Sequence, residues 1–153
     1  MTPILPRQLD DVYLGHVAAV WLFVPVLLMK TGIALATIFN GREAAQTADG
    51  IPLTTFGPAG ADAVVALFGI WGATFLAVSA IGILAVVRYR AMIPLMYVIL
   101  LGEHLARRAV LLVKPIARAS TPPGGYVNMV LLVLMVVGLT LSLWERDRTR
   151  IVG

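Results

Sequence analysis

Four long apolar runs constrain this sequence of 153 residues more than any other feature, because each is about as long as a bilayer-crossing helix. Hydrophobic residues make up 59% of the chain and charged residues only 13%, a composition that excludes an ordinary water-soluble domain. Lipid leaves open backbone groups unsatisfied, and none of the runs alternates polar and apolar residues as a barrel strand does. We therefore predict an all-α, polytopic membrane protein.

The connectors divide the runs into four transmembrane helices of one domain, residues 1–153. A polar outer loop rich in glycine and proline, residues 40–60, follows the first run, and Asp62 is expected to cap the second helix. The basic turn Arg88–Arg90 is so short that the second and third helices should be antiparallel neighbours. The predicted spans are about 13–39, 61–87, 91–113 and 126–144.

Arginine is unevenly distributed between the two sides that four spans define. The side of the chain ends carries Arg7, Arg88, Arg90, Arg146, Arg148 and Arg150, and the other side carries Arg42, Lys114 and Arg118. The positive-inside rule then predicts that both termini lie in the cytoplasm. The same rule accounts for the net charge of +4, so we expect membrane lipids and no nucleic acid as partners. The first residues lack the basic stretch and cleavage site of a signal peptide, so the first run should remain as a span.

Small residues form a stripe on the second run and repeat on the first. They are Ala66, Gly69, Ala73, Ala77 and Ala80, together with Gly32 and Ala36. Small side chains let helix backbones approach closely in lipid. We expect these two helices to contact each other through the stripe, or the stripe to form the interface of an oligomer.

The third run is interrupted by ionisable residues. At 1.5 Å per residue, Glu103 lies about 18 Å and Arg107 about 24 Å from the inner start of this helix, and Lys30 lies about 25 Å along the first. Glu103 and Arg107 share one helix face, and His104 and Arg108 form the adjacent pair. Charges at this depth avoid lipid, so we expect the polar face to point into the bundle, with Lys30 and Glu103 as an ion pair.

The charge count of this expected pocket favours an anionic ligand. Lys30, Arg107 and Arg108 are three cations, and Glu103 supplies one negative charge, which leaves an excess of about +2. A phosphate, a carboxylate or another acidic headgroup from the outer leaflet would balance it. The alternative is that Glu103 pairs with Arg107 along its own helix. The side chains of Lys30, Arg108 and Lys114 would then extend to the outer headgroups.

The two histidines lie at different expected depths. His16 is about 5 Å and His104 about 20 Å from the inner starts of their helices, so one haem iron is not reached by both within a monomer. Ligation of a tetrapyrrole by a single histidine, His104 or His16, is left open, and no other cofactor is predicted.

No catalytic or metal-binding motif is present. The chain has no cysteine, no HExxH zinc motif, no GxSxG nucleophile elbow and no phosphate-binding glycine loop. We therefore predict a protein that is not an enzyme in itself, without catalytic residues or metal ligands.

The layout resembles that of small bacterial DoxX-like four-helix membrane proteins. The resembling features are Lys30 near the outer end of the first span, followed by Gly32, a glycine- and proline-containing outer loop, and the basic turn Arg88–Arg90. The resemblance implies an inner-membrane accessory role or the binding of a small hydrophobic molecule.

Two functions remain open at this point. The first is binding of an anionic lipid or lipid-like ligand in an outer-leaflet pocket built from Lys30, Glu103, His104, Arg107 and Arg108. The second is an accessory or assembly subunit of a larger membrane complex, docked through the small-residue face of the second helix. A transporter or channel is less favoured because four helices leave little room for a pore.

Overall fold

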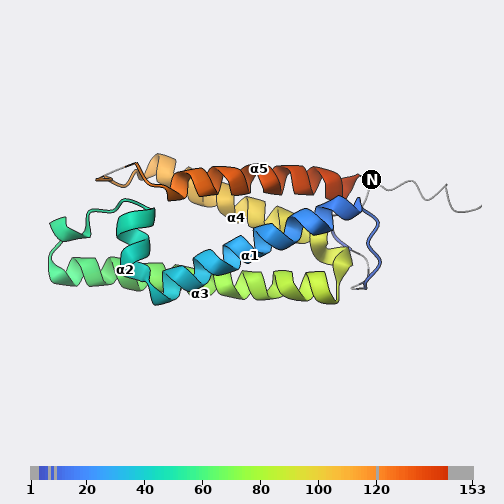
Figure 1. Cartoon of the computed structure of the whole chain (residues 1–153), viewed down its shortest axis with the longest axis horizontal. Helices are drawn as coiled ribbons and strands as arrows, with labels where there is room; N and C mark the ends of the chain where they lie inside the picture. The colour runs from blue at the N-terminus through green and yellow to red at the C-terminus, as the bar shows by residue number, and fades with distance from the viewer. Residues whose placement is uncertain (1–3, 7, 9, 120, 145–153) are drawn as a thin grey trace, which may run out of the picture.

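The computed structural model describes residues 4–6, 8, 10–119 and 121–144, and its architecture is a bundle of long helices (Figure 1). The long helices are α1 (Val17–Phe39), α3 (Pro58–Val87), α4 (Ile93–Val113) and α5 (Gly124–Leu143). The described part of the chain contains no strand, so the predicted all-α class is confirmed.

The helices run alternately up and down, with α1 crossing obliquely between α3 and α5 (Figure 1). The start of α1 therefore lies beside the end of α5, where the His16 N–H donates to the Leu141 carbonyl at 3.2 Å. The turn before α4 is at the same end, since the Ala91 N–H donates to the Asp10 carbonyl. The described chain thus begins and ends at one end of the bundle. Four of the arginines used to predict orientation, Arg7, Arg146, Arg148 and Arg150, lie outside the described residues.

Three of the long helices, α1, α3 and α5, are long and apolar enough to cross a membrane. Their outward faces carry large apolar side chains, such as Trp21 on α1 and Leu67 on α3. A helix that is apolar on every side is typical of a membrane span. Helix α4 is of similar length but carries Glu103, Arg107 and Arg108.

The predicted helix boundaries differ from the observed ones by a few residues. α1 starts at Val17 because His16 caps it, with Nδ1 accepting from the Ala18 N–H at 3.1 Å. α3 starts at Pro58, and proline is favoured in a first helical turn. The predicted Asp62 cap is therefore wrong. Asp62 instead accepts a hydrogen bond from Arg42 at 2.9 Å on the exposed surface.

The segment between α1 and α3 folds into a cap over one end of the bundle. It contains α2 (Gly41–Glu43), a π-helical turn (Ala44–Ala48) and a 3-10 turn (Leu53–Thr55). Ala45, Ile51 and Leu53 are buried together with Ala61 of α3. We call residues 41–55 the cap; their apolar contacts with α3 hold them in place.

The core of the other half is built around Tyr97 of α4. Its hydroxyl donates to the Ala19 carbonyl at 2.8 Å, and its ring stacks edge-on against Phe23 at 5.0 Å. A Cβ at Gly138 would collide with this ring, so α5 approaches α4 closely at that residue. Helix α4 consequently packs chiefly on α5, and its contact with its antiparallel sequence neighbour α3 is small.

The contact between α1 and α3 is the most extensive in the bundle, but the small-residue stripe does not form it. A Cβ at Gly72 would lie 2.9 Å from the Ala34 carbonyl, and a Cβ at Gly82 would lie 2.7 Å from Leu27. Gly32 and Gly69, by contrast, face open space. The remaining stripe residues are exposed; they are Ala36, Ala66, Ala73, Ala77 and Ala80. The helix contact is thus confirmed, the proposed packing face is wrong, and an oligomer interface stays a prediction.

Candidate functional site

The ionisable residues of α4 have different environments. Glu103 and Arg107 are partly buried, His104 is buried, and Arg108 is exposed. The inward direction predicted for this polar face is therefore correct for the first three residues, whereas Arg108 is exposed and contacts α5 at the edge of the bundle.

Lys30 and Glu103 form an ion pair between α1 and α4. Lys30 Nζ lies 2.8 Å from Glu103 Oε2, and the side chains are 5% and 26% exposed. The ammonium also lies 4.8 Å from the centre of the Phe75 ring. The predicted pair is confirmed, and the alternative in which Lys30 extends to the headgroups is wrong. The two charges largely neutralise each other.

Arg107 is held by two different helices. Its Nη2 donates to Asn128 Oδ1 of α5 at 2.7 Å, and its guanidinium lies 5.2 Å from the Trp71 ring of α3. A cation above an aromatic face and a short charge-assisted hydrogen bond each fix the side chain. Arg107 therefore occupies a defined position among α3, α4 and α5.

An aromatic ladder on α3 supports both buried cations. Phe68 and Trp71 have ring centres 5.9 Å apart, and Trp71 and Phe75 have centres 4.9 Å apart. Spacings of three and four residues put all three rings on one helix face. Arg107 of α4 lies over the Trp71 ring, and Lys30 of α1 lies over the Phe75 ring. The aromatic ladder therefore contacts one cation from each of these two helices.

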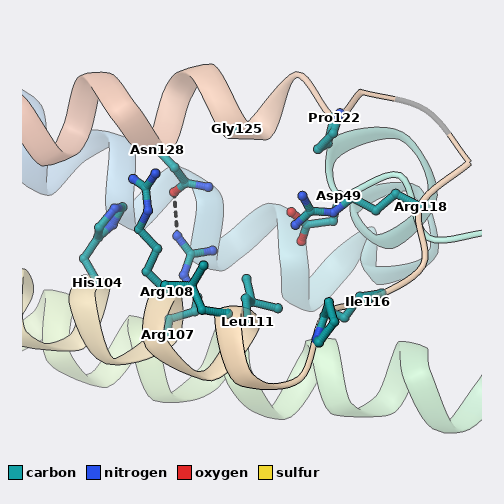
Figure 2. A pocket seen from close by; sticks show the side chains of 12 residues that line it. Asp49, His104, Arg107, Arg108, Leu111, Ile116, Arg118, Pro122, Gly125 and Asn128 are labelled. Carbon is teal, nitrogen blue, oxygen red and sulfur yellow. Dashed lines mark hydrogen bonds between the residues drawn. The ribbon is translucent and has the colours of Figure 1, made fainter.

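A cavity of about 290 Å³ opens between α4, α5 and the cap (Figure 2). Its lining includes three arginines, a histidine, an amide and one carboxylate. In chain order, these polar residues are Asp49, His104, Arg107, Arg108, Arg118 and Asn128. We call this space the head cavity. Figure 2 shows Arg118 and Asp49 close together at one end of it and His104 at the other.

His104 lies in the wall of the head cavity with an unused polar atom. The residue is 2% exposed, and its Nδ1 makes no hydrogen bond within the part of the chain that the structure describes. A buried polar atom without a partner is unfavourable unless a further group satisfies it. His16, at the start of α1, is capped to Ala18 instead and does not line this cavity.

Only part of the predicted charge lies in the head cavity: Arg107 and Arg108 line it together with His104. Lys30 and Glu103 do not line it, whereas Arg118 and Asp49 do. Three arginines against the carboxylate of Asp49 again leave an excess of about +2 when His104 is neutral. The predicted excess of positive charge is the same, but a different set of residues supplies it.

Asp49 is the acidic group of the cavity and belongs to the cap. Burial raises the pKa of its carboxyl above the ordinary value of 3.8, while Arg107 and Arg118 act in the opposite direction. The net increase shows that desolvation outweighs the attraction of the two guanidinium groups. The cap thus places a carboxyl that accepts a proton readily beside the arginines.

Three site residues were missed because their relevance depends on the folded path of the chain. Asp49 lies in the cap, Arg118 follows α4, and Asn128 is a single amide in an apolar helix. Asn128 carried a weak signal, since a lone polar residue within a span tends to face protein. Among the described residues, no group of three His, Cys, Asp or Glu side chains is placed to hold a metal ion.

Comparison of the chain with family models, curated proteins and solved structures finds no match. The geometry of the head cavity is therefore the main indication of what the protein binds.

Proposed function

We propose that this protein is a four-span inner-membrane protein that binds the anionic headgroup of a lipid or lipid-like ligand in the head cavity. The observation that carries this proposal is the cluster of Arg107, Arg108 and Arg118 around one cavity, with only Asp49 as internal counter-charge. Arginine is suited to carboxylates and phosphates because its planar fork donates two parallel hydrogen bonds.

In this proposal α4 crosses the membrane in addition to α1, α3 and α5, and both ends of the chain are in the cytoplasm. Its charges do not prevent crossing, because Glu103 is paired with Lys30 and Arg107 is bonded to Asn128. Arg108 is long enough to reach the outer headgroup layer from the cavity edge. This orientation puts the cap and the head cavity at the outer leaflet.

Native mass spectrometry of the full chain, extracted gently with its lipids, tests the headgroup proposal. Arg108→Gln and Arg118→Gln each remove one cavity charge, and we expect both to reduce the fraction of protein carrying an anionic lipid. Arg42→Gln is the matched control, because Arg42 lies in the cap outside the head cavity and should retain the wild-type lipids. Unchanged lipid adducts in both cavity variants would contradict the proposal.

A second candidate function is an accessory subunit of a larger membrane complex or a homo-oligomer. The exposed small residues of α3 favour it, because Ala73 and Ala77 leave a flat helix surface that the described residues of the chain do not cover. Ala73→Phe should then abolish co-purification of the partner chain or shift the oligomer to monomer. If the assembly is unchanged by Ala73→Phe and Ala77→Phe, this second candidate is rejected.

A further inference from the structure

We propose that the ligand is an amphiphile whose hydrocarbon chain occupies a second cavity, separate from the one that binds its head. This inference rests on the proposed function, because it takes the head cavity as the anion site and assigns the remainder of the same ligand.

The second cavity has a volume of about 470 Å³ and lies beneath the cap, among α1, α3 and α5. We call it the tail cavity. Its surface is mainly apolar, and the side chains that supply this surface are Ile33, Ala36, Phe68, Trp71 and Val127. Ligand pockets in proteins commonly have volumes of about 300–1,000 Å³. The tail cavity lies within this range, and its volume is comparable to that of one long hydrocarbon chain.

The two cavities share part of their lining. Arg107, Asn128 and Asp49 line both. The hydrogen bond between Arg107 and Asn128 is therefore located at the boundary between a cationic space and an apolar one. An anion that contacts Arg107 from the head cavity lies next to the tail cavity, so we assign the chain attached to that anion to the neighbouring apolar space.

Charge and polarity fit an amphiphile better than a free anion or a neutral lipid. The head cavity has three arginines, whose guanidinium groups can donate hydrogen bonds to an anionic head. The tail cavity offers the indole face of Trp71 and aliphatic side chains to a hydrocarbon. A free phosphate would leave the apolar space unfilled, and a neutral lipid would leave the arginine charge unbalanced.

Three matched probes separate the two parts of the ligand. Lysophosphatidylglycerol has both head and chain, glycerol phosphate has the head alone, and monoacylglycerol has the same chain with an uncharged head. Binding of each probe is measured by calorimetry on the full chain in nanodiscs of zwitterionic lipid. We expect lysophosphatidylglycerol to bind at least about tenfold more tightly than either fragment.

Two kinds of variant distinguish failure of this inference from failure of the proposed function. Ala36→Phe fills the tail cavity and should weaken lysophosphatidylglycerol about tenfold or more while leaving glycerol phosphate unchanged. Arg108→Gln should weaken both phosphate-bearing probes. Ala63→Phe, at an exposed residue of α3 that lines neither cavity, is the control. Val127→Phe fills the tail cavity from the α5 side and should have the same effect as Ala36→Phe. Circular dichroism identifies the variants that fold.

The outcomes are separate. If neither Ala36→Phe nor Val127→Phe changes the affinity for lysophosphatidylglycerol, the tail assignment is overturned and the headgroup proposal stands. If Arg108→Gln and Arg118→Gln leave both phosphate-bearing probes unaffected, or monoacylglycerol binds as tightly as lysophosphatidylglycerol, the headgroup proposal itself is overturned.

Discussion

Two kinds of ionised residue share the half of this bundle next to the cap, and they have different roles. Lys30 and Glu103 are paired across 2.8 Å and line none of the described cavities. Arg107, which lines the head and tail cavities, is fixed by Asn128 and Trp71. The pair thus stabilises the position of α4 against α1, and the arginine beside it is available to a ligand.

Breaking the ion pair from one side should be destabilising. Lys30→Met leaves the carboxylate of Glu103 unbalanced, and we expect a loss of about 3 kcal/mol in the free energy of unfolding. This is the lower end for a broken buried pair, because the Glu103 side chain is 26% exposed. The double variant Lys30→Met with Glu103→Gln should recover most of the loss, measured by denaturation in detergent. A double variant no more stable than Lys30→Met would show that the pair is not the cause.

Asp49 should make ligand binding depend on pH. Burial raises its pKa, so its carboxyl becomes neutral at a higher pH than an ordinary aspartate. Because the pKa of this carboxyl is higher in the folded protein than its ordinary value of 3.8, its protonated form stabilises the fold. This stability is fully present below pH 3.8 and is lost as the pH rises through the folded-state pKa. Neutralising this carboxyl also removes the negative charge beside Arg107 and Arg118. Affinity for an anionic head should therefore increase as pH falls through this pKa.

Lysophosphatidylglycerol tests this dependence, because a phosphodiester keeps its charge through the acidic range. Asp49→Asn should bind it more tightly than wild type at neutral pH and lose most of the pH dependence. Two other titratable groups face the cavities, His104 and Glu43, so His104→Gln and Glu43→Gln are the controls. A pH profile that persists in Asp49→Asn and disappears in His104→Gln would assign the effect to the histidine.

At the scale of helices, Gly72 is one of the two glycines, with Gly82, that allow the close approach of α1 to α3. A Cβ at Gly72 would lie 2.9 Å from the Ala34 carbonyl, whereas Gly69, one turn away, faces open space. Both Gly→Ala changes gain about 1 kcal/mol of helix propensity, so their difference isolates the collision. We expect Gly72→Ala to be less stable than Gly69→Ala by about 1–3 kcal/mol in thermal unfolding. Equal stabilities of the two variants would mean that α1 and α3 make room for the added methyl group without any loss of stability.

The different surroundings of Gly69 and Gly72 illustrate which parts of the fold could be predicted from the sequence. Run length alone gave the number and approximate limits of the long helices. The inward face of α3 was not predictable, because the helix is apolar on every side and its small residues lie on more than one face. On α4, by contrast, charges mark the inward side, and the ion pair of Lys30 with Glu103 followed from depth and sign.

At the scale of the whole molecule, the cap lies at one end of the bundle, and the first and last described residues lie at the other (Figure 1). The chain has no cysteine, so single cysteines report exposure without background. Thr54→Cys is in the cap and Gln8→Cys is near the first described residues, both exposed. With both termini cytoplasmic, an impermeant maleimide should label Thr54→Cys in intact bacterial cells and Gln8→Cys only after permeabilisation. The reverse pattern would invert the proposed orientation and place the head cavity at the inner leaflet.

The stacking of Arg107 on Trp71 gives the protein an intrinsic fluorescent reporter. The chain has three tryptophans, and Trp21 and Trp144 are 73% and 68% exposed on the outside of the bundle. Trp71 alone contacts a cavity arginine at 5.2 Å. Any molecule that draws the guanidinium away from the indole alters the quantum yield of that one fluorophore. Occupancy of the site is therefore readable from the emission of a protein retaining only Trp71, without a dye or a radiolabel.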